Sequence, residues 1–377
     1  MMENNKLKHY ALPDVAQLKV HGRTTESRSP LTLFWTGSAV ELNVTGTELW
    51  IEVDSKYDVC EPWISVLIND VVVSRQMLVH GRYWVCIFRG MNESVTKNVR
   101  IVKDTQAMSG DPGCVLQIHA LKSDGAFQLV EDRPYKVEFI GDSITSGEGA
   151  IGAQAEEDWI PMWFSAIQNY TAMTAEALHA DYRVISQSGW GVMTSWDNNP
   201  SANIPQYYDQ VCGLLTGEMN EALGAHNPHD FNAWQPDVVV VNLGSNDGGA
   251  FQTPEWTDPN TGVTYKQRLN ADGTYHEEDV AKFEQAAYQF LIQLRKNNTK
   301  AHIVWAYGML GFPMMPAIYR AVDIYMKETG DRSVSVIQLP NTTSETVGAR
   351  THPGMLSHKR AAETLTEHLR GILQHHS

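Results

Sequence analysis

The chain has 377 residues, enough for two or three domains of about 150 residues each. It carries 29 Lys and Arg against 44 Asp and Glu, and the resulting formal net charge of −15 excludes proteins whose main partner is nucleic acid or an anionic membrane surface. With 42% hydrophobic and 19% charged residues, the composition also excludes a chain that is disordered throughout.

The first 20 residues show neither an apolar run after a basic patch nor a small-residue cleavage site, so they do not resemble a secretory leader. No segment reaches about 18 uninterrupted apolar residues, and no transmembrane helix is expected. The four cysteines, Cys60, Cys86, Cys114 and Cys212, fit neither a metal knuckle nor a dense disulfide framework. We therefore expect reduced thiols and a cytoplasmic location. A secreted protein whose leader has been removed is the alternative.

The first third of the chain is rich in short β-type runs. Gly, Asn, Asp or Pro separates most of these runs, which cover residues 31–35, 39–44, 48–53, 63–68, 71–78, 83–88, 99–102 and 114–121. Short strands at this spacing, without a helical run, are typical of an antiparallel sandwich or barrel. We predict an N-terminal all-β domain over residues 1–130 with a jelly-roll-like sandwich fold.

From about residue 131 onward, strands alternate with helices. Apolar runs predict strands buried on both faces at 137–140, 182–186, 237–243, 302–307 and 335–339. Helices are predicted over 162–179, 280–296, 318–328 and 356–374, an irregular segment over 195–233, and an inserted loop or hairpin over 256–277. This alternation predicts a doubly wound α/β domain over residues 131–377, with a five-stranded parallel sheet and a site at the carboxyl ends of its strands.

Four short motifs fall at that edge of the predicted sheet. Ser143, in GDSITSGEG, follows the first strand, where backbone N–H groups can stabilise an anion. Gly189, in SQSGWGV, follows the second strand and lets the backbone approach a substrate closely. Asn246, in GSNDGG, offers an uncharged NH2 donor, and His352, in THPG, is a candidate general base before the last helix. Taken singly, each is explained as well by an ordinary turn or surface residue.

Together and in this order, the four residues resemble the four blocks of the SGNH (GDSL) hydrolase superfamily over residues 137–374. The preceding sandwich, with the stretches WQPDVVVVNLG and YYDQV, further resembles carbohydrate esterase family 2. The resemblance implies a serine esterase that removes O-acetyl groups from saccharides such as xylo-oligosaccharides through an acetyl-enzyme intermediate, without metal or organic cofactor. It implies Ser143 as nucleophile, His352 as its base, and an oxyanion hole made by the Ser143 and Gly189 N–H groups and the Asn246 side chain.

One position departs from the superfamily pattern. Where most members carry Asp three residues before the His, this chain has Ala349. Some members orient the His through a backbone carbonyl, and this favours a Ser–His dyad here. The alternative is that an acid elsewhere in the chain, such as Glu345, orients the His.

Other residues near the motifs give further expectations. Trp190, Trp196 and Trp256 are candidates to line the substrate cleft, although packing in the core or a loop is the commoner fate of a tryptophan. Asp142 is expected to fix the turn before the nucleophile through backbone hydrogen bonds.

The sequence leaves two other functions open. A lipase or thioesterase of the same superfamily would need a wide apolar acyl pocket, and a catalytically weak carbohydrate-binding protein would explain the missing Asp. No metal site is expected, because His226, His229, His375 and His376 resemble solvated loop or tail residues. The sequence does not determine the oligomeric state, and a homo-oligomer is compatible with it.

Overall fold

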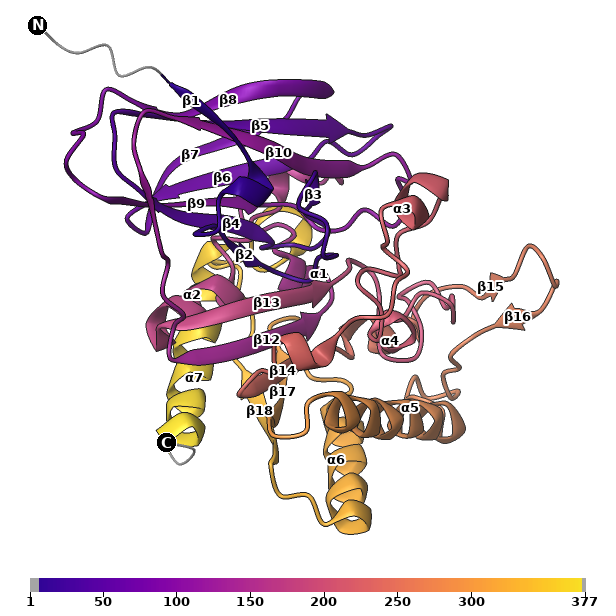
Figure 1. Ribbon diagram of the computed structural model, residues 1–377. Coiled ribbons are helices and arrows are strands. Elements are labelled where there is room, and N and C mark those ends of the chain that lie inside the picture. The colour runs from indigo at the N-terminus through magenta and orange to yellow at the C-terminus, as the bar shows by residue number, and fades with distance from the viewer. Residues whose placement is uncertain (1–6, 375–377) are drawn as a thin grey trace, which may run out of the picture. The chain divides into compact units, whose positions relative to one another are not determined.

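The computed structural model describes residues 7–374 (Figure 1). The chain forms two compact units. The first contains the residues up to Asp132 together with Ile160–Met162 and Gln210–Pro228. The second contains Arg133–Trp159, Trp163–Asp209 and the chain from His229 onward.

The first unit consists mainly of two antiparallel sheets. One sheet has the strand order β1-β10-β5-β8, with β3 also paired to β10, and the other has the order β11-β4-β9-β6-β7, with β2 also paired to β4. The strands are β1 (Lys8–Ala11), β2 (Lys19–His21), β3 (Leu31–Thr32), β4 (Ala39–Val44), β5 (Glu48–Lys56), β6 (Trp63–Ile68), β7 (Val71–Met77), β8 (Gly81–Arg89), β9 (Lys97–Lys103), β10 (Val115–Ser123) and β11 (Phe127–Gln128).

The two sheets share one hydrophobic core. Along β5, buried and half-buried residues alternate, as the two-residue period of a strand requires when one face is covered. Ile51 of β5 and Ile118 of β10 belong to the same buried cluster as Leu42 of β4 and Ile101 of β9. The predicted all-β sandwich is confirmed.

The first unit also includes residues 210–228, which the sequence analysis assigned to the second domain. Four apolar side chains of this segment, Val211, Cys212, Leu214 and Leu215, are buried. The indole N–H of Trp35 donates to the Val211 carbonyl at 2.6 Å. A division at residue 130 into two continuous stretches therefore misses this segment, because its apolar run packs with the sandwich.

The second unit is built on a five-stranded parallel sheet of order β13-β12-β14-β17-β18. Figure 1 shows α2 and α7 on one face of this sheet and α5 and α6 on the other. The strands are β12 (Tyr135–Gly141), β13 (Ala180–Ser186), β14 (Val238–Asn242), β17 (His302–Gly308) and β18 (Val334–Leu339). The helices and turns are α1 (Ser143–Ser146), η2 (Pro161–Trp163), α2 (Tyr170–Leu178), η3 (Pro205–Tyr207), α3 (Glu218–Ala222), η4 (Phe231–Ala233), α4 (Ser245–Gly249), α5 (Glu277–Asn297), α6 (Met315–Thr329), η5 (Ala349–Thr351) and α7 (Met355–Gln374), of which α3 and part of η2 belong to the first unit.

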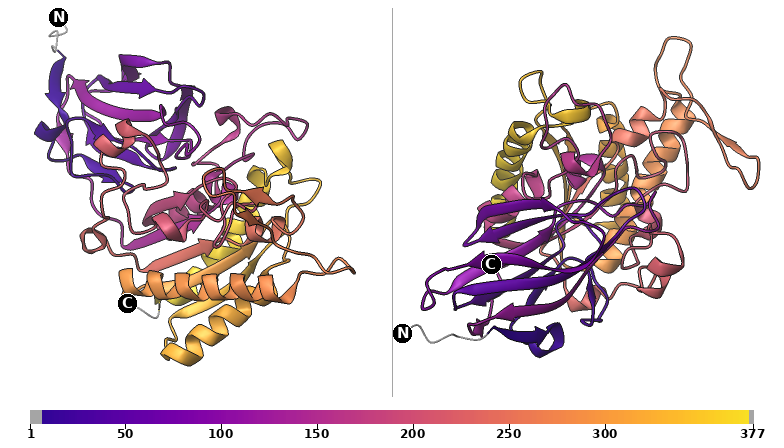
Figure 2. Two further views of the ribbon diagram at one scale, coloured as in Figure 1. Left: turned by 90° about the vertical axis from the view of Figure 1, so that its right-hand side faces the viewer. Right: turned by 90° about the horizontal axis from the view of Figure 1, so that it is seen from above.

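This arrangement confirms the predicted α/β domain, with two local differences. The helix predicted over 162–179 begins only at Tyr170, because the Asn169 side chain accepts a hydrogen bond from the Thr171 N–H and caps the helix there. The polar stretch 256–277 contains a short hairpin of β15 (Trp256–Thr257) and β16 (Thr264–Tyr265). Figure 2 shows this hairpin extending away from the sheet and helices of the second unit.

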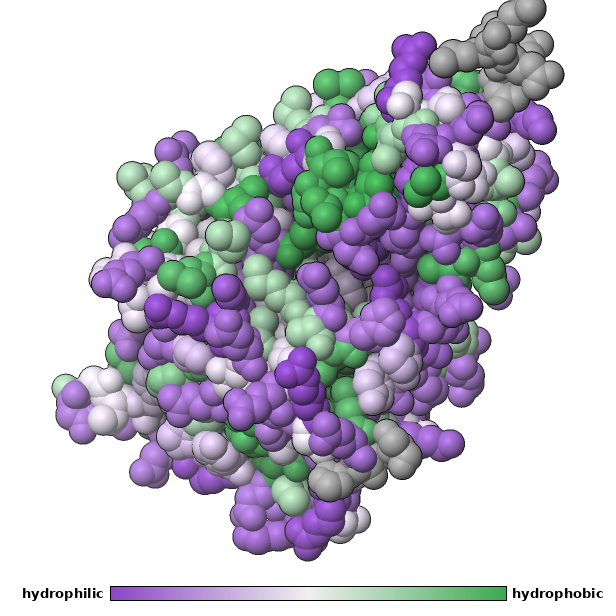
Figure 3. Space-filling model, turned by 90° about the vertical axis from the view of Figure 1, so that its left-hand side faces the viewer, coloured by the Kyte–Doolittle hydropathy of each residue, from purple (hydrophilic) through white to green (hydrophobic). Residues whose placement is uncertain are grey.

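One face of the molecule is largely hydrophilic. On the face drawn in Figure 3, hydrophilic residues dominate and apolar side chains gather in small patches, as the excess of acidic residues leads one to expect. No helix within residues 7–374 combines the length and the apolar composition needed to cross a bilayer.

Candidate active site

The carboxyl ends of three neighbouring parallel strands and the loop before α7 bring the four motifs together. Ser143 follows β12, Gly189 follows β13, and Asn246 lies in α4 just after β14. His352 lies between η5 and α7. All four line one pocket within the second unit, at the edge where open α/β sheets place their ligand sites.

Ser143 is held by a tight turn. The Asp142 Oδ1 accepts a hydrogen bond from the Ile144 N–H at 3.0 Å and caps the first turn of α1, which is the turn-fixing role expected of this carboxylate. Gly141 is required just before it, because a Cβ there would overlap the hydroxyl of Thr145. The backbone of this turn therefore holds Ser143, which is 6% exposed, at the pocket wall.

His352 contacts Ser143 through one ring nitrogen and the backbone through the other. Its Nε2 lies 3.0 Å from the Ser143 Oγ, and its Nδ1 lies 2.8 Å from the Arg350 carbonyl oxygen. A carbonyl oxygen can only accept, so the Nδ1 carries the proton and donates to Arg350. The Nε2 is then free to accept the hydroxyl proton of Ser143, which is the tautomer a general base needs.

The backbone that supplies this carbonyl adopts an uncommon conformation. Arg350 and Thr351 have φ angles of 56° and 54°, in the left-handed region that residues with a Cβ rarely occupy. Two hydrogen bonds hold it, from the Arg350 N–H to Glu156 O at 2.7 Å and from the Gly348 N–H to His352 O at 2.8 Å. The turn is thereby bent so that the Arg350 carbonyl faces the imidazole.

These contacts bear on which group orients His352. Ala349 is fully buried, and Glu345 is exposed. Within residues 7–374, the group that binds the Nδ1 of His352 is the Arg350 carbonyl and not a carboxylate. The structure therefore favours the backbone carbonyl over Glu345.

The three expected oxyanion donors belong to residues that line the pocket, namely Ser143, Gly189 and Asn246. Gly189 has a φ of 80°, and a Cβ there would lie 2.9 Å from the Trp196 ring, so both conformation and space call for glycine. In the loops and turns of the described chain, the backbone N–H groups of Ser143 and Gly189 donate to no carbonyl. The Nδ2 of Asn246 donates to the Trp190 carbonyl at 2.9 Å and to the Asp142 Oδ2 at 3.2 Å.

Two buried carboxyl groups lie behind these donors. Burial raises the pKa of Asp142 to about 7, and the neighbouring carboxylates of Asp247 and Glu148 add to the effect. Burial likewise raises the pKa of Asp247 to about 6, although its carboxylate accepts N–H groups from Val192 and Met193. Asp247 thus fixes the loop after β13, and Asp142 fixes Asn246.

The pocket has a volume of about 430 Å³ and includes residues that the sequence analysis did not select. Its walls combine polar groups with two partly exposed indoles. They are formed by Ser143, Glu148, Trp159, Ser188, Gly189, Trp196, Asn246, Arg350 and His352.

Of the three tryptophans predicted at the cleft, the structure places only Trp196 in the pocket wall, 53% exposed. The Trp190 ring packs against Tyr207 at 5.4 Å, and the residue reaches the site through its carbonyl instead. Trp256 lies on the projecting hairpin, against Tyr265. Trp159, which no motif marked, lines the pocket and is 39% exposed.

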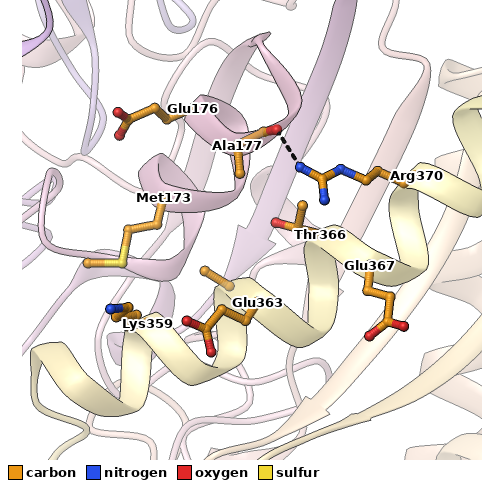
Figure 4. A pocket seen from close by; sticks show the side chains of 9 residues that line it. Met173, Glu176, Ala177, Lys359, Glu363, Thr366, Glu367 and Arg370 are labelled. Carbon is orange, nitrogen blue, oxygen red and sulfur yellow. Dashed lines mark hydrogen bonds between the residues drawn. The ribbon is translucent and has the colours of Figure 1, made fainter.

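A larger hollow of about 1000 Å³ lies between α2 and α7 (Figure 4). Its wall carries charged side chains such as Lys359 and Glu363, and Arg370 donates to the Ala177 carbonyl at 3.1 Å. Neither serine nor histidine lines it. The groups able to perform acyl transfer therefore lie in the smaller pocket.

The remaining histidines named above have other contacts. The His226 Nε2 lies 2.6 Å from the Leu215 carbonyl, and His229 packs edge-on against Phe231. Residues 7–374 contain no group of three His, Cys, Asp or Glu side chains arranged to hold a metal ion. His375 and His376 lie outside the described residues.

Comparison with known proteins identifies relatives of both units. Residues 139–339 match the GDSL-like Lipase/Acylhydrolase family. An acetyl xylan esterase from the rumen bacterium Butyrivibrio proteoclasticus is 46% identical, with a TM-score of 0.96 over 98% of this chain and 99% of that one. A family two carbohydrate esterase from Clostridium thermocellum, solved with cellohexaose, has a TM-score of 0.78 at 24% identity over 95% of this chain and 99% of that one, a likeness of fold.

Two curated proteins are more distant relatives. The cellulase/esterase CelE of Acetivibrio thermocellus is 26% identical over 346 residues, which are 90% of this chain and 37% of that protein. An acetylxylan esterase / glucomannan deacetylase of Cellvibrio japonicus is 28% identical over 234 residues, 61% of each protein. The chain thus spans less than two thirds of either relative.

Proposed function

The chain belongs to the GDSL-like lipase/acylhydrolase family, and we propose that it is an esterase that removes O-acetyl groups from acetylated saccharides, xylo-oligosaccharides among them. The observation that carries the proposal is the 3.0 Å contact between the Ser143 Oγ and the His352 Nε2 in an open, Trp-lined pocket. The 46% identity to an acetyl xylan esterase over almost the whole chain supports the choice of substrate.

The proposed reaction begins with proton transfer. The His352 Nε2 takes the proton of the Ser143 hydroxyl as the oxygen attacks the acetyl carbonyl carbon. The Arg350 carbonyl, bound to the Nδ1–H, keeps the ring in the required tautomer. The protonated Nε2 then donates to the sugar oxygen, the C–O bond breaks, and the acetyl group stays on Ser143. Water repeats the two steps and releases acetate.

The negatively charged oxygen of the tetrahedral intermediate has to be stabilised by hydrogen-bond donors. The proposed donors are the N–H groups of Ser143 and Gly189 and the side-chain amide of Asn246, and these three residues line the same pocket. Both amide hydrogens of Asn246 have acceptors in the resting site, so one of them must turn from Asp142 or Trp190 towards the oxyanion.

The lining of the pocket favours a short acyl group on a sugar. Trp159 and Trp196 expose flat apolar rings suited to the face of a pyranose. Glu148 and Arg350 place a carboxylate and a guanidinium in the same wall. A long acyl chain bound there would cover the Arg350 guanidinium, whose side chain is 30% exposed, without replacing its contacts with water, which speaks against a lipase.

Acetate release from acetylated xylo-oligosaccharides tests the proposal. The native chain should release acetate and leave the sugar backbone intact, and Ser143→Ala should abolish the release. A carbohydrate-binding protein without activity would bind the oligosaccharide and release none. That outcome would overturn the proposal.

A further inference from the structure

Glu148 is a buried carboxylate beside the base, and the reaction outlined above assigns it no role. Its side chain is 3% exposed, and its Oε1 lies 3.8 Å from the His352 Nε2. The same oxygen accepts the Arg350 Nε–H at 3.0 Å. It therefore lies on the side of the imidazole that faces Ser143, opposite to the nitrogen bound by the Arg350 carbonyl.

The backbone around Glu148 fixes this placement. Its N–H donates to the Ser143 carbonyl at 3.0 Å, which ties the residue to the nucleophile. The flanking Gly147 and Gly149 have φ angles of 80° and 71°, and a Cβ on Gly149 would lie 2.6 Å from the His352 Cβ. The two glycines thus let the loop run directly against the histidine.

A negative charge near His352 would assist the proposed reaction. When the imidazole accepts the Ser143 proton it becomes a cation, and a neutral carbonyl stabilises that cation less than a carboxylate would. The usual carboxylate is absent, because Ala349 occupies its position. Glu148 supplies one within 4 Å from the other side of the ring.

We propose that Glu148 is a positioning residue that stabilises the protonated form of His352 during acyl transfer, and that Arg350 holds its carboxylate in place while opposing its charge. The proposal rests on the roles of Ser143 and His352 in the proposed function, but not on the nature of the sugar.

Other charged or titratable groups also face this histidine or its neighbours. Asp142 lies behind the nucleophile with Asp247 beyond it, and burial raises the pKa of both. On α7, burial lowers the pKa of His358 to about 3, so it is neutral at the pH of the reaction. Of the charged groups, Glu148 and Arg350 are the pair in direct contact with each other and with the His352 loop.

The test measures kcat and kcat/KM against pH with 4-nitrophenyl acetate, whose hydrolysis does not depend on saccharide recognition. Glu148→Gln keeps the shape of the side chain and removes its charge. We expect kcat to fall about 10- to 100-fold, and the midpoint of the acidic limb of the pH profile to move about one pH unit lower, because the imidazolium loses a neighbouring anion.

The matching variant is Arg350→Gln, which leaves Glu148 unopposed and should move the same midpoint to higher pH. Glu157→Gln is the control, because it removes an exposed carboxylate from the loop whose carbonyl Arg350 binds, and should change neither quantity. Thermal unfolding establishes that each variant is folded.

A folded Glu148→Gln with an unchanged midpoint would overturn the proposal, even if its rate fell. So would a shift of both variants in the same direction. If Glu148→Gln does not fold, Arg350→Gln alone tests the proposal. A midpoint of its acidic limb that stays unchanged or moves to lower pH contradicts the proposal. Loss of saccharide deacetylation with intact 4-nitrophenyl acetate hydrolysis would contradict the proposed substrate and leave this inference standing.

Discussion

The imidazole Nδ1 of His352 lies 2.8 Å from the carbonyl oxygen of Arg350, two residues earlier in the chain. A short left-handed turn thus orients the base with its own backbone, at the place where relatives of this superfamily commonly carry an aspartate. The orienting group is uncharged. Any electrostatic help for the imidazolium must come from another direction.

Glu345→Ala should leave kcat/KM within about 3-fold of the native value. The Glu345 side chain is exposed, while the carbonyl that binds the Nδ1 of His352 belongs to Arg350. Steady-state kinetics with 4-nitrophenyl acetate measure the effect. A loss approaching the ~10⁴-fold seen when a triad aspartate is neutralised would show that Glu345 is the orienting acid.

Trp159→Ala and Trp196→Ala should each raise KM for acetylated xylo-oligosaccharides about 3- to 10-fold, because each removes an indole face from the pocket wall. With vinyl acetate, which carries no sugar, KM should change much less. Trp256→Ala is the control, since its ring lies on the hairpin outside the pocket. An equal loss on both substrates would assign the two indoles to the stability of the site instead.

Acetyl esters should be hydrolysed faster than octanoyl esters of the same alcohol. The Arg350 side chain is 30% exposed in the pocket wall, and an octanoyl chain would have to desolvate its guanidinium. We expect kcat/KM to fall by at least about 10-fold from acetyl to octanoyl. A preference for octanoyl would favour the lipase hypothesis.

Asp142→Asn should change how stability depends on pH. In the folded chain the pKa of Asp142 is raised by burial to about 7, from 3.8 for an ordinary aspartate, so the folded state holds its proton more tightly than the unfolded state. Between about pH 4 and pH 7 the carboxyl group therefore costs the native chain stability as pH rises, and above pH 7 the cost is constant.

The asparagine cannot ionise, so the difference in Tm between Asp142→Asn and the native chain should become several degrees more favourable to the variant from pH 5 to pH 8. Asp132→Asn, on an exposed carboxylate, is the control. A Tm difference for Asp142→Asn that stays constant with pH would refute the raised pKa. Its activity is not expected to survive intact, since Asp142 also binds Asn246.

Much of the fold was predictable because each unit has a strong local signal. The alternation along β5 and the uninterrupted apolar run of β14 are properties of neighbouring residues. The segment 210–228 was not predictable in this way. Its packing against Trp35 joins residues 176 positions apart in the sequence, and no local pattern records such a contact.

The same distinction between local signals and long-range contacts holds for the site. Ser143, Gly189, Asn246 and His352 follow strands or precede a helix, so topology alone brings them to one edge of the sheet. The direction in which a side chain points does not follow from this topology. Adjacency to Gly189 suggested Trp190 for the pocket wall, but its ring turns to Tyr207.

Glu148 lies inside the GDSITSGEG motif and Arg350 lies directly before the THPG motif, but neither was predicted as a site residue. Glu148 follows the nucleophile by five residues, and Arg350 precedes the histidine by two. A charge pair 202 positions apart becomes visible only when the two loops meet. A charged residue between two glycines in a nucleophile loop is the signal that could have pointed to it.

The most direct measurement is mass spectrometry of the enzyme quenched with acid during turnover of an acetylated xylo-oligosaccharide. The proposed function predicts an acetyl group on the peptide that contains Ser143, its disappearance as substrate is exhausted, and its absence in Ser143→Ala. Continued acetate release by Ser143→Ala, with no acetylated peptide at any stage in the native chain, would contradict it.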